Sequence, residues 1–169
     1  MVKRLLAFAV AVAFAPCAFS GEPSPEILAK KLMSVWESGD VEQLESFMSP
    51  DVLYEDLANG RSLDGIAATS AYISHVHTWA SGVSIEVTRV FGNDSEAAAV
   101  WVMTAIQSGP IPGRVPIATN RPIEVHGITL VTIEDGKISR ATDSLDALGF
   151  VLQLGATVDL PGGVRLPPE

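Results

Sequence analysis

The order of two hydrophobic periodicities along the chain constrains its fold most strongly. Apolar residues recur at helical spacing near the beginning, as in Leu28, Leu32, Val35 and Trp36. From Val83 onward they occur in strand-like stretches separated by turn residues. Helices followed by a run of strands are typical of an α+β domain. We therefore predict helices laid across a curved antiparallel sheet, which together enclose an apolar pocket.

Local start and stop signals place the expected elements. Ser24-Pro25-Glu26 begins a first helix that ends at Gly39, and Asp64 caps a later helix that reaches about Trp79. A loop rich in proline, which is also a candidate lid, is expected over residues 109–122. The other expected elements are short helices over residues 41–48 and 145–154 and strands over residues 52–57, 83–91, 96–107, 123–133 and 138–143.

Charge and cysteine content exclude several classes of function. The chain has 169 residues, with 11 basic and 20 acidic side chains and a net charge of -9. Binding to nucleic acid or to anionic lipid needs a basic surface, so we expect neither partner. A single cysteine excludes an intramolecular disulfide framework and a cysteine-rich zinc site.

The N-terminal segment has the pattern of an export signal. Lys3 and Arg4 precede an apolar run over residues 5–15, which is too short to span a bilayer at about 20 residues. Small residues then lead to a cleavage site near Ser20. We predict a signal peptide over residues 1–20, a domain over 21–157 and a tail over 158–169. The mature protein would be periplasmic or secreted, without stable membrane insertion. A buried N-terminal helix and a lipid anchor on Cys17 are the alternatives.

An ordered set of short motifs resembles one family. The motifs are Ser38-Gly39-Asp40, Tyr54-Glu55-Asp56, Asp64-Gly65, Glu134-Asp135-Gly136-Lys137-Ile138, Leu152-Gln153-Leu154-Gly155 and Asp159-Leu160-Pro161-Gly162-Gly163. Together they resemble the SnoaL-like branch (polyketide and ester cyclase-like) of the nuclear transport factor 2-like superfamily. The resemblance implies a cone-shaped curved antiparallel sheet, wrapped by about three helices around a deep pocket. It also implies a homodimer and acid/base chemistry that needs no cofactor.

Aspartates of the expected pocket are the first candidates for catalysis. By the resemblance, Asp56 falls on the catalytic base of ketosteroid isomerase, and Asp143 falls on the acid/base position of the cyclases. Burial in an apolar pocket raises a carboxyl pKa and suits the group to proton transfer near neutral pH. In the structural alternative Asp56 caps the turn at Asn59-Gly60, and Asp143 caps the last helix. Asp146 is either a first-turn charge of that helix or a further pocket residue.

The chain departs from two enzymes of the superfamily. Leu32 stands where the isomerase has its oxyanion tyrosine, and Ile128 or Thr129 stands where it has a protonated aspartate. The Arg-x-Asp of the epoxide hydrolases is also absent from the strand over residues 123–133. We therefore expect neither steroid isomerisation nor epoxide opening.

Glu124 and His126 lie two residues apart on an expected strand and therefore share one face. A carboxylate beside an imidazole fixes its tautomer and raises its basicity. We predict that both side chains line the pocket and that His126 lies close to a partly protonated Asp143. The alternative is a half-exposed strand end near the proline loop.

Three further side chains are candidates for pocket walls. Tyr54 shares a strand face with Asp56, and Trp101 lies on a central strand, where it could stack on a flat ligand. His77 follows the apolar side of its helix. Its neighbour His75 points about 200° away, so the two cannot chelate one ion, and we expect no metal. Packing in the core is the alternative for each of the three.

These features favour an exported enzyme with general acid/base catalysis by Asp143, assisted by His126 and Asp56. Its substrate would be a small apolar carbonyl compound, and the reaction a cyclisation, isomerisation or hydrolysis. The alternative is a ligand-binding or dimerisation module of the same fold without turnover. We expect the homodimer to form through the convex face of the sheet.

Overall fold

The computed structural model describes residues 22–167, so the expected signal peptide and Cys17 lie outside the described residues. Within this range four helical segments occur: α1 (Pro25–Ser38), the 3-10 helix η1 (Val41–Ser46), α2 (Gly65–Trp79) and α3 (Ala147–Gln153). None of them is both long and apolar enough to cross a membrane.

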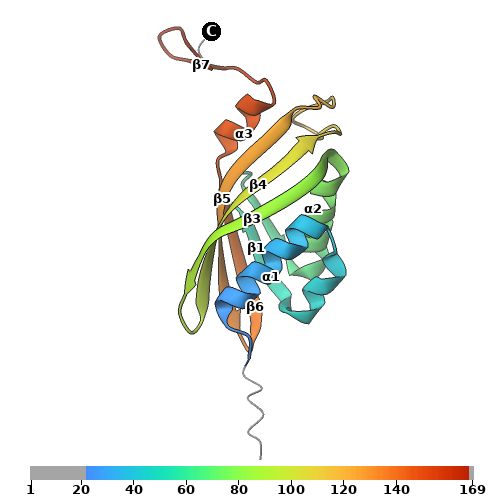
Figure 1. Cartoon of the computed structure of the whole chain (residues 1–169), viewed down its shortest axis with the longest axis vertical. Helices are drawn as coiled ribbons and strands as arrows, with labels where there is room; N and C mark the ends of the chain where they lie inside the picture. Colours follow the sequence, from blue (N-terminus) through green and yellow to red (C-terminus); the bar gives the residue numbers. More distant parts are fainter. Residues whose placement is uncertain (1–21, 168–169) are drawn as a thin grey trace, which may run out of the picture.

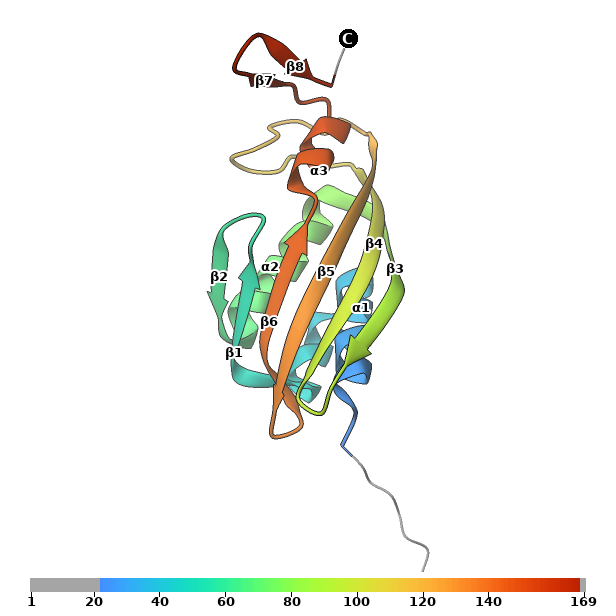
Figure 2. The ribbon, with the colours of Figure 1, turned by 90° about the vertical axis from the view of Figure 1, so that its left-hand side faces the viewer.

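Six strands form the main sheet. They are β1 (Met48–Asp56), β2 (Arg61–Asp64), β3 (Ala80–Gly92), β4 (Glu96–Gln107), β5 (Pro122–Glu134) and β6 (Lys137–Leu145), in the spatial order β2-β1-β6-β5-β4-β3. Helices α1 and α2 cover one face, and the other face looks outward (Figures 1 and 2). The predicted α+β class and cone-shaped sheet are confirmed, with one addition: β1 and β6 pair in parallel.

Helix α1 begins and ends as its sequence predicts. Pro25 occupies the first turn, Glu26 lies at the positive end of the helix dipole, and Gly39 adopts a φ of 72° after the last turn. The Ser24 side chain, however, donates and accepts no capping hydrogen bond. The buried face, which includes Leu28 and Leu32, packs in the core between helices and sheet.

Several elements differ from the expectation. The segment after Asp40 is a 3-10 helix that ends at Ser46, two residues earlier than predicted. Strand β2 was not expected, because its four residues are mostly polar and exposed. The tail, in which the sequence predicted no helix or strand, forms a hairpin of β7 (Val158–Leu160) and β8 (Val164–Leu166). This hairpin extends beyond α3, away from the sheet (Figure 1).

Candidate functional site

A single open cavity carries the candidate chemistry among the described residues. It lies between the inner face of the sheet, α2, α3 and the loop over residues 108–121, and it has an empty volume of about 990 Å³ including its open mouth. Its walls are mainly apolar, and Asp56 and Asp143 both line it. A concave, mostly apolar space with a few polar groups is typical of a small-molecule site.

Asp143 is the central polar group of this cavity. It lies on β6 with only 7% of its surface exposed. Its Oδ1 accepts a hydrogen bond from the Thr129 hydroxyl on β5, and its Oδ2 accepts one from the Tyr54 hydroxyl on β1. The alternative in which Asp143 caps the last helix is wrong, because Asp146 occupies that position.

Two buried tryptophans fix the direction of these hydrogen bonds. The Trp101 indole N–H donates to Thr129 Oγ1 at 2.9 Å, and the Trp36 indole N–H donates to Tyr54 Oη at 3.0 Å. An indole N–H can only donate, so each hydroxyl accepts from the indole and keeps its own hydrogen for Asp143. The carboxylate therefore ends two parallel chains of hydrogen bonds, each running from indole to hydroxyl to carboxylate.

Gly127 makes room for one of the two tryptophans. It pairs with Trp101 across β4 and β5, and a Cβ atom at this position would lie 2.3 Å from Cζ2 of the indole ring. No side chain larger than hydrogen fits there without moving the ring. The glycine thus lets the indole lie flat against β5, where its N–H reaches Thr129.

Burial and hydrogen bonding act in opposite directions on Asp143. Desolvation, the largest effect, raises the pKa of Asp143 to about 6, while the hydrogen bonds from Thr129 and Tyr54 hold that pKa down. The charge of Asp56 adds a smaller upward effect. Desolvation and the Asp143 charge raise the pKa of Tyr54 well above its usual value, so its hydroxyl stays protonated. At neutral pH Asp143 is thus mostly ionised and close to its titration range.

Asp56 belongs to a second cluster beside the first. It lies directly opposite Asp143 on the parallel pair β1–β6 and is 2% exposed. Its Oδ1 accepts from the Asn59 backbone N–H at 2.9 Å, and its Oδ2 accepts from the Asn59 amide and the Tyr72 hydroxyl. Asp56 therefore both caps the turn, as the alternative has it, and lines the cavity.

The structure contradicts the predicted positions of Glu124 and His126. The two side chains share a face and lie 3.2 Å apart, from His126 Nε2 to Glu124 Oε1. That face is the outer one, however, and their side chains are 63% and 65% exposed. Alternation fixes which residues share a face but does not fix which face is buried. Neither side chain lines the cavity, and His126 does not assist Asp143.

Three other residues that we predicted to line the pocket lie outside the cavity wall. His77 Nε2 lies 2.9 Å from the Trp36 carbonyl oxygen and joins α2 to α1, whereas its neighbour His75 lines the cavity. Exposed Asp146 accepts from the Gly149 N–H and caps α3. Tyr54 is fully buried behind Asp143 and does not line the cavity. Of the predicted wall residues, only Trp101 faces the cavity as expected.

The sequence analysis did not identify several polar groups of the site. Tyr72, Asn59, His75, Arg61 and Arg114 all line the cavity. The sequence could have indicated Asn59, because it follows Asp56 in the same turn. It could not have indicated Tyr72, because Tyr72 lies on a helix whose position relative to that turn no sequence pattern predicts. No group of three or more His, Cys, Asp or Glu residues within the range 22–167 could hold a metal ion.

Comparison with known proteins identifies the family. The model of the SnoaL-like domain matches residues 29–141. A search of curated proteins gave no match. The structure of TsrD from Streptomyces laurentii is 26% identical, with a TM-score of 0.67 over 76% of this chain and 92% of that chain.

Two further solved structures share the fold at lower identity. A hypothetical protein from Catenulispora acidiphila with a ketosteroid isomerase-like fold, in complex with trimethylamine, is 18% identical, with a TM-score of 0.64 over 79% of this chain and 95% of that chain. A protein from Jannaschia sp. CCS1, assigned as a SnoaL-like polyketide cyclase, is 16% identical, with a TM-score of 0.67 over 86% and 99%. The chain therefore belongs to the SnoaL-like domain family and has the small-molecule-binding nuclear transport factor 2-like fold.

Proposed function

We propose that this protein is a cofactor-independent acid/base catalyst in which the Asp143 carboxylate takes a proton from a small apolar carbonyl compound. One observation carries the proposal. Asp143 lines an apolar cavity, and both of its oxygens accept hydrogen bonds from hydroxyls whose direction two indoles fix. This arrangement prepares an ionised carboxylate in a desolvated site, which is what a general base near neutral pH requires.

The proposed first step is abstraction of a proton from carbon beside the substrate carbonyl. The proton moves to an Asp143 oxygen, and the C–H electron pair moves toward the carbonyl oxygen as an enolate forms. His75, the imidazole that lines the cavity among the described residues, would donate an N–H to that oxygen. Return of the proton to another carbon gives isomerisation. Attack of the enolate carbon on a second carbonyl breaks the π bond of that carbonyl, and its oxygen takes the proton from Asp143, which gives cyclisation.

This assignment differs from the one expected from the sequence. We expected a partly protonated Asp143 assisted by His126, but His126 lies on the outer face of the sheet. Burial raises the pKa of Asp143 to about 6, so the carboxylate form predominates at pH 7. A base role for Asp143 and a donor role for His75 therefore fit the cavity better.

The experiment is a thermal-shift screen of flat carbonyl compounds, followed by turnover assays on the ligands found. Asp143→Asn should reduce turnover by about 10²- to 10⁴-fold, the usual contribution of a general base, while ligand binding persists. Asp146→Asn is the matched control, because Asn also caps helices and Asp146 does not line the cavity. Equal turnover of wild type and Asp143→Asn would contradict the proposal.

A second candidate function is ligand binding without turnover. The same hydrogen bonds favour this function. Each Asp143 oxygen already accepts a hydrogen bond from the protein, which makes the carboxylate less ready to take a proton from a ligand. Saturable binding of a carbonyl compound with no product, in wild type and variant alike, would establish this function instead.

We further propose that the protein is exported after cleavage near Ser20. The proposal rests on the basic start, the short apolar run and the small residues before the cleavage site. Intact mass of material recovered outside the cytoplasm should correspond to a chain beginning near Gly21. A mass that retains Met1, or a lipid on Cys17, would contradict it.

A further inference from the structure

Two arginines line the cavity without a carboxylate partner. Arg61 and Arg114 are exposed residues of its wall and therefore belong to its mouth. Within residues 22–167 neither guanidinium forms a hydrogen bond or an ion pair, whereas Arg140 pairs with Glu55 and Arg165 pairs with Asp159. In a chain with 20 acidic and 11 basic residues, two unpaired guanidinium groups on one cavity call for an explanation.

The position of Arg61 follows from the β1–β2 hairpin. Arg61 lies directly opposite Asp56, so both side chains belong to the same face of the sheet. Arg61 Cζ lies 5.4 Å from the centre of the Tyr72 ring, which holds the guanidinium beside the cavity. The oxygens of Asp56 accept from Asn59 and Tyr72 rather than from Arg61. The guanidinium N–H groups thus remain available to a ligand.

Arg114 is presented by an anchored loop. The Ile111 side chain is buried in the core, and the Arg114 N–H donates to the Ile111 carbonyl oxygen at 3.0 Å. At the base of the loop, fully buried Gln107 accepts from the Thr119 N–H at 2.6 Å and donates to the Ile117 carbonyl oxygen at 3.0 Å. This loop lies near α3, toward the same end of the molecule as the β1–β2 turn (Figure 2).

We propose that the ligand is a small apolar carboxylic acid whose carboxylate binds Arg61 and Arg114 at the mouth of the cavity. A guanidinium presents a planar fork of donors that matches a carboxylate. Inside the cavity the negative charges of Asp56 and Asp143 repel the carboxylate of the ligand. The carboxylate therefore stays at the mouth, and the apolar body of the ligand enters the cavity. The far end of the ligand then reaches Asp143. That orientation rests on the proposed function, but the anion site itself does not.

The experiment compares two probes with the same flat apolar body, 2-naphthoate and its methyl ester. Titration of the mature protein at pH 7.5 and low salt should show about tenfold tighter binding of the acid, the value expected for one charge-assisted hydrogen bond. Arg61→Gln and Arg114→Gln should each weaken binding of the acid more than binding of the ester and so remove most of this preference. The preference should also shrink as sodium chloride screens the charges.

Arg89→Gln is the matched control, because Arg89 is exposed and lies outside the cavity wall. Equal affinity for the acid and the ester, equal loss of both in the arginine variants, or binding of neither probe would overturn the anion site. Preference for the acid without any turnover would leave the anion site standing and count against the proposed catalysis. Turnover without a preference for the acid would support the proposed catalysis and overturn the anion site.

Discussion

Asp56 and Asp143 lie directly opposite each other on the parallel strands β1 and β6, and both line one cavity. Within the part of the chain that the structure describes, neither carboxylate forms an ion pair. Each instead accepts hydrogen bonds from its own set of neutral donors, Asn59 and Tyr72 for Asp56, and Thr129 and Tyr54 for Asp143. Neutral donors stabilise the charged form of a carboxylate without cancelling its charge.

Stability should fall as pH rises through the titration of Asp143. Desolvation raises the pKa of Asp143 from 3.8 to about 6, so the folded state holds this proton more tightly than the unfolded state. The resulting stabilisation is complete below about pH 4 and is lost as pH rises through about 6. Between these limits wild type should lose about 3 kcal/mol relative to Asp143→Asn. Urea denaturation of both proteins from pH 4 to 7.5 measures the difference, and parallel curves would contradict it.

Removal of either hydroxyl should make Asp143 a weaker acid. The hydrogen bonds from Thr129 and Tyr54 lower the pKa of Asp143, so Thr129→Val and Tyr54→Phe should each raise it. One hydrogen bond to a charged group corresponds to a shift of about one pH unit. An NMR titration of the Asp143 carboxyl carbon measures the midpoint. Ser144→Ala is the control, because exposed Ser144 is its chain neighbour. An unmoved midpoint in both variants would show that the hydroxyls do not orient toward Asp143.

Gly127→Ala should displace the Trp101 ring and destabilise the protein. The new Cβ would lie 2.3 Å from the indole, and overpacking of this kind costs about 1–3 kcal/mol. Urea denaturation measures the loss. Trp101→Phe replaces the indole by a shorter ring, so the double variant should be less destabilised than the sum of the two single variants. Strict additivity would mean that the two residues do not compete for space.

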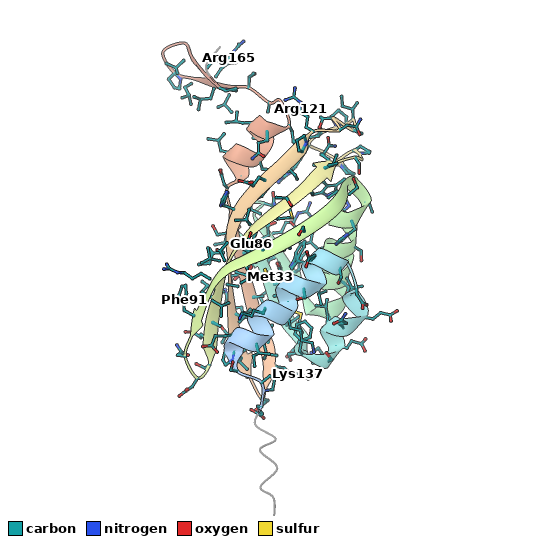
Figure 3. The ribbon with its side chains drawn as sticks, in the orientation of Figure 1. Met33, Glu86, Phe91, Arg121, Lys137 and Arg165 are labelled. Carbon is teal, nitrogen blue, oxygen red and sulfur yellow. The ribbon has the colours of Figure 1, made fainter. Side chains whose placement is uncertain are left out.

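We propose that the protein dimerises through the outer face of the sheet. That face carries exposed apolar side chains, among them Phe91, Ile106 and Leu130. Figure 3 labels Phe91 near the β3–β4 turn, on the side of the molecule opposite α2. Sedimentation should show a dimer at concentrations of roughly tens of micromolar, and Leu130→Glu should give a monomer. Ile27→Glu, an exposed change on α1, should not. A wild-type monomer at these concentrations would count against the proposal.

The fold could be predicted because its long elements have strong local patterns. Helix α1 has its apolar stripe, its N-terminal proline and its C-terminal glycine, and the long strands are bounded by clear turns. Strand β2 and the β7–β8 hairpin escaped prediction because short polar strands have no apolar period. Their pairing depends on partner strands, which a local pattern does not reveal.

The candidate site was predictable only in part. Asp56 and Asp143 were found because the family resemblance marks their positions. His126 was assigned to the wrong face because Ile128 and Leu130 continue its side of β5, although the opposite side carries more apolar residues, namely Ile123, Val125, Val131 and Ile133. On α2 we likewise chose the wrong side of the element: we predicted that His77 lines the cavity, whereas His75 does. Thr129 became visible as a donor to Asp143 only when the register of β5 and β6 was known.

The parallel pairing of β1 with β6 also has a consequence for the order of folding. Strands β3 to β6 pair with their neighbours in sequence, and the β3–β4 and β5–β6 hairpins close short turns. The β1–β6 pair instead joins residues as far apart as Asp56 and Asp143. Closing so long a loop carries a larger entropic penalty and makes this contact kinetically slow. The two carboxylates therefore meet through the slowest class of contact in the sheet, and a partly folded chain with intact hairpins would lack the carboxylate pair of the cavity.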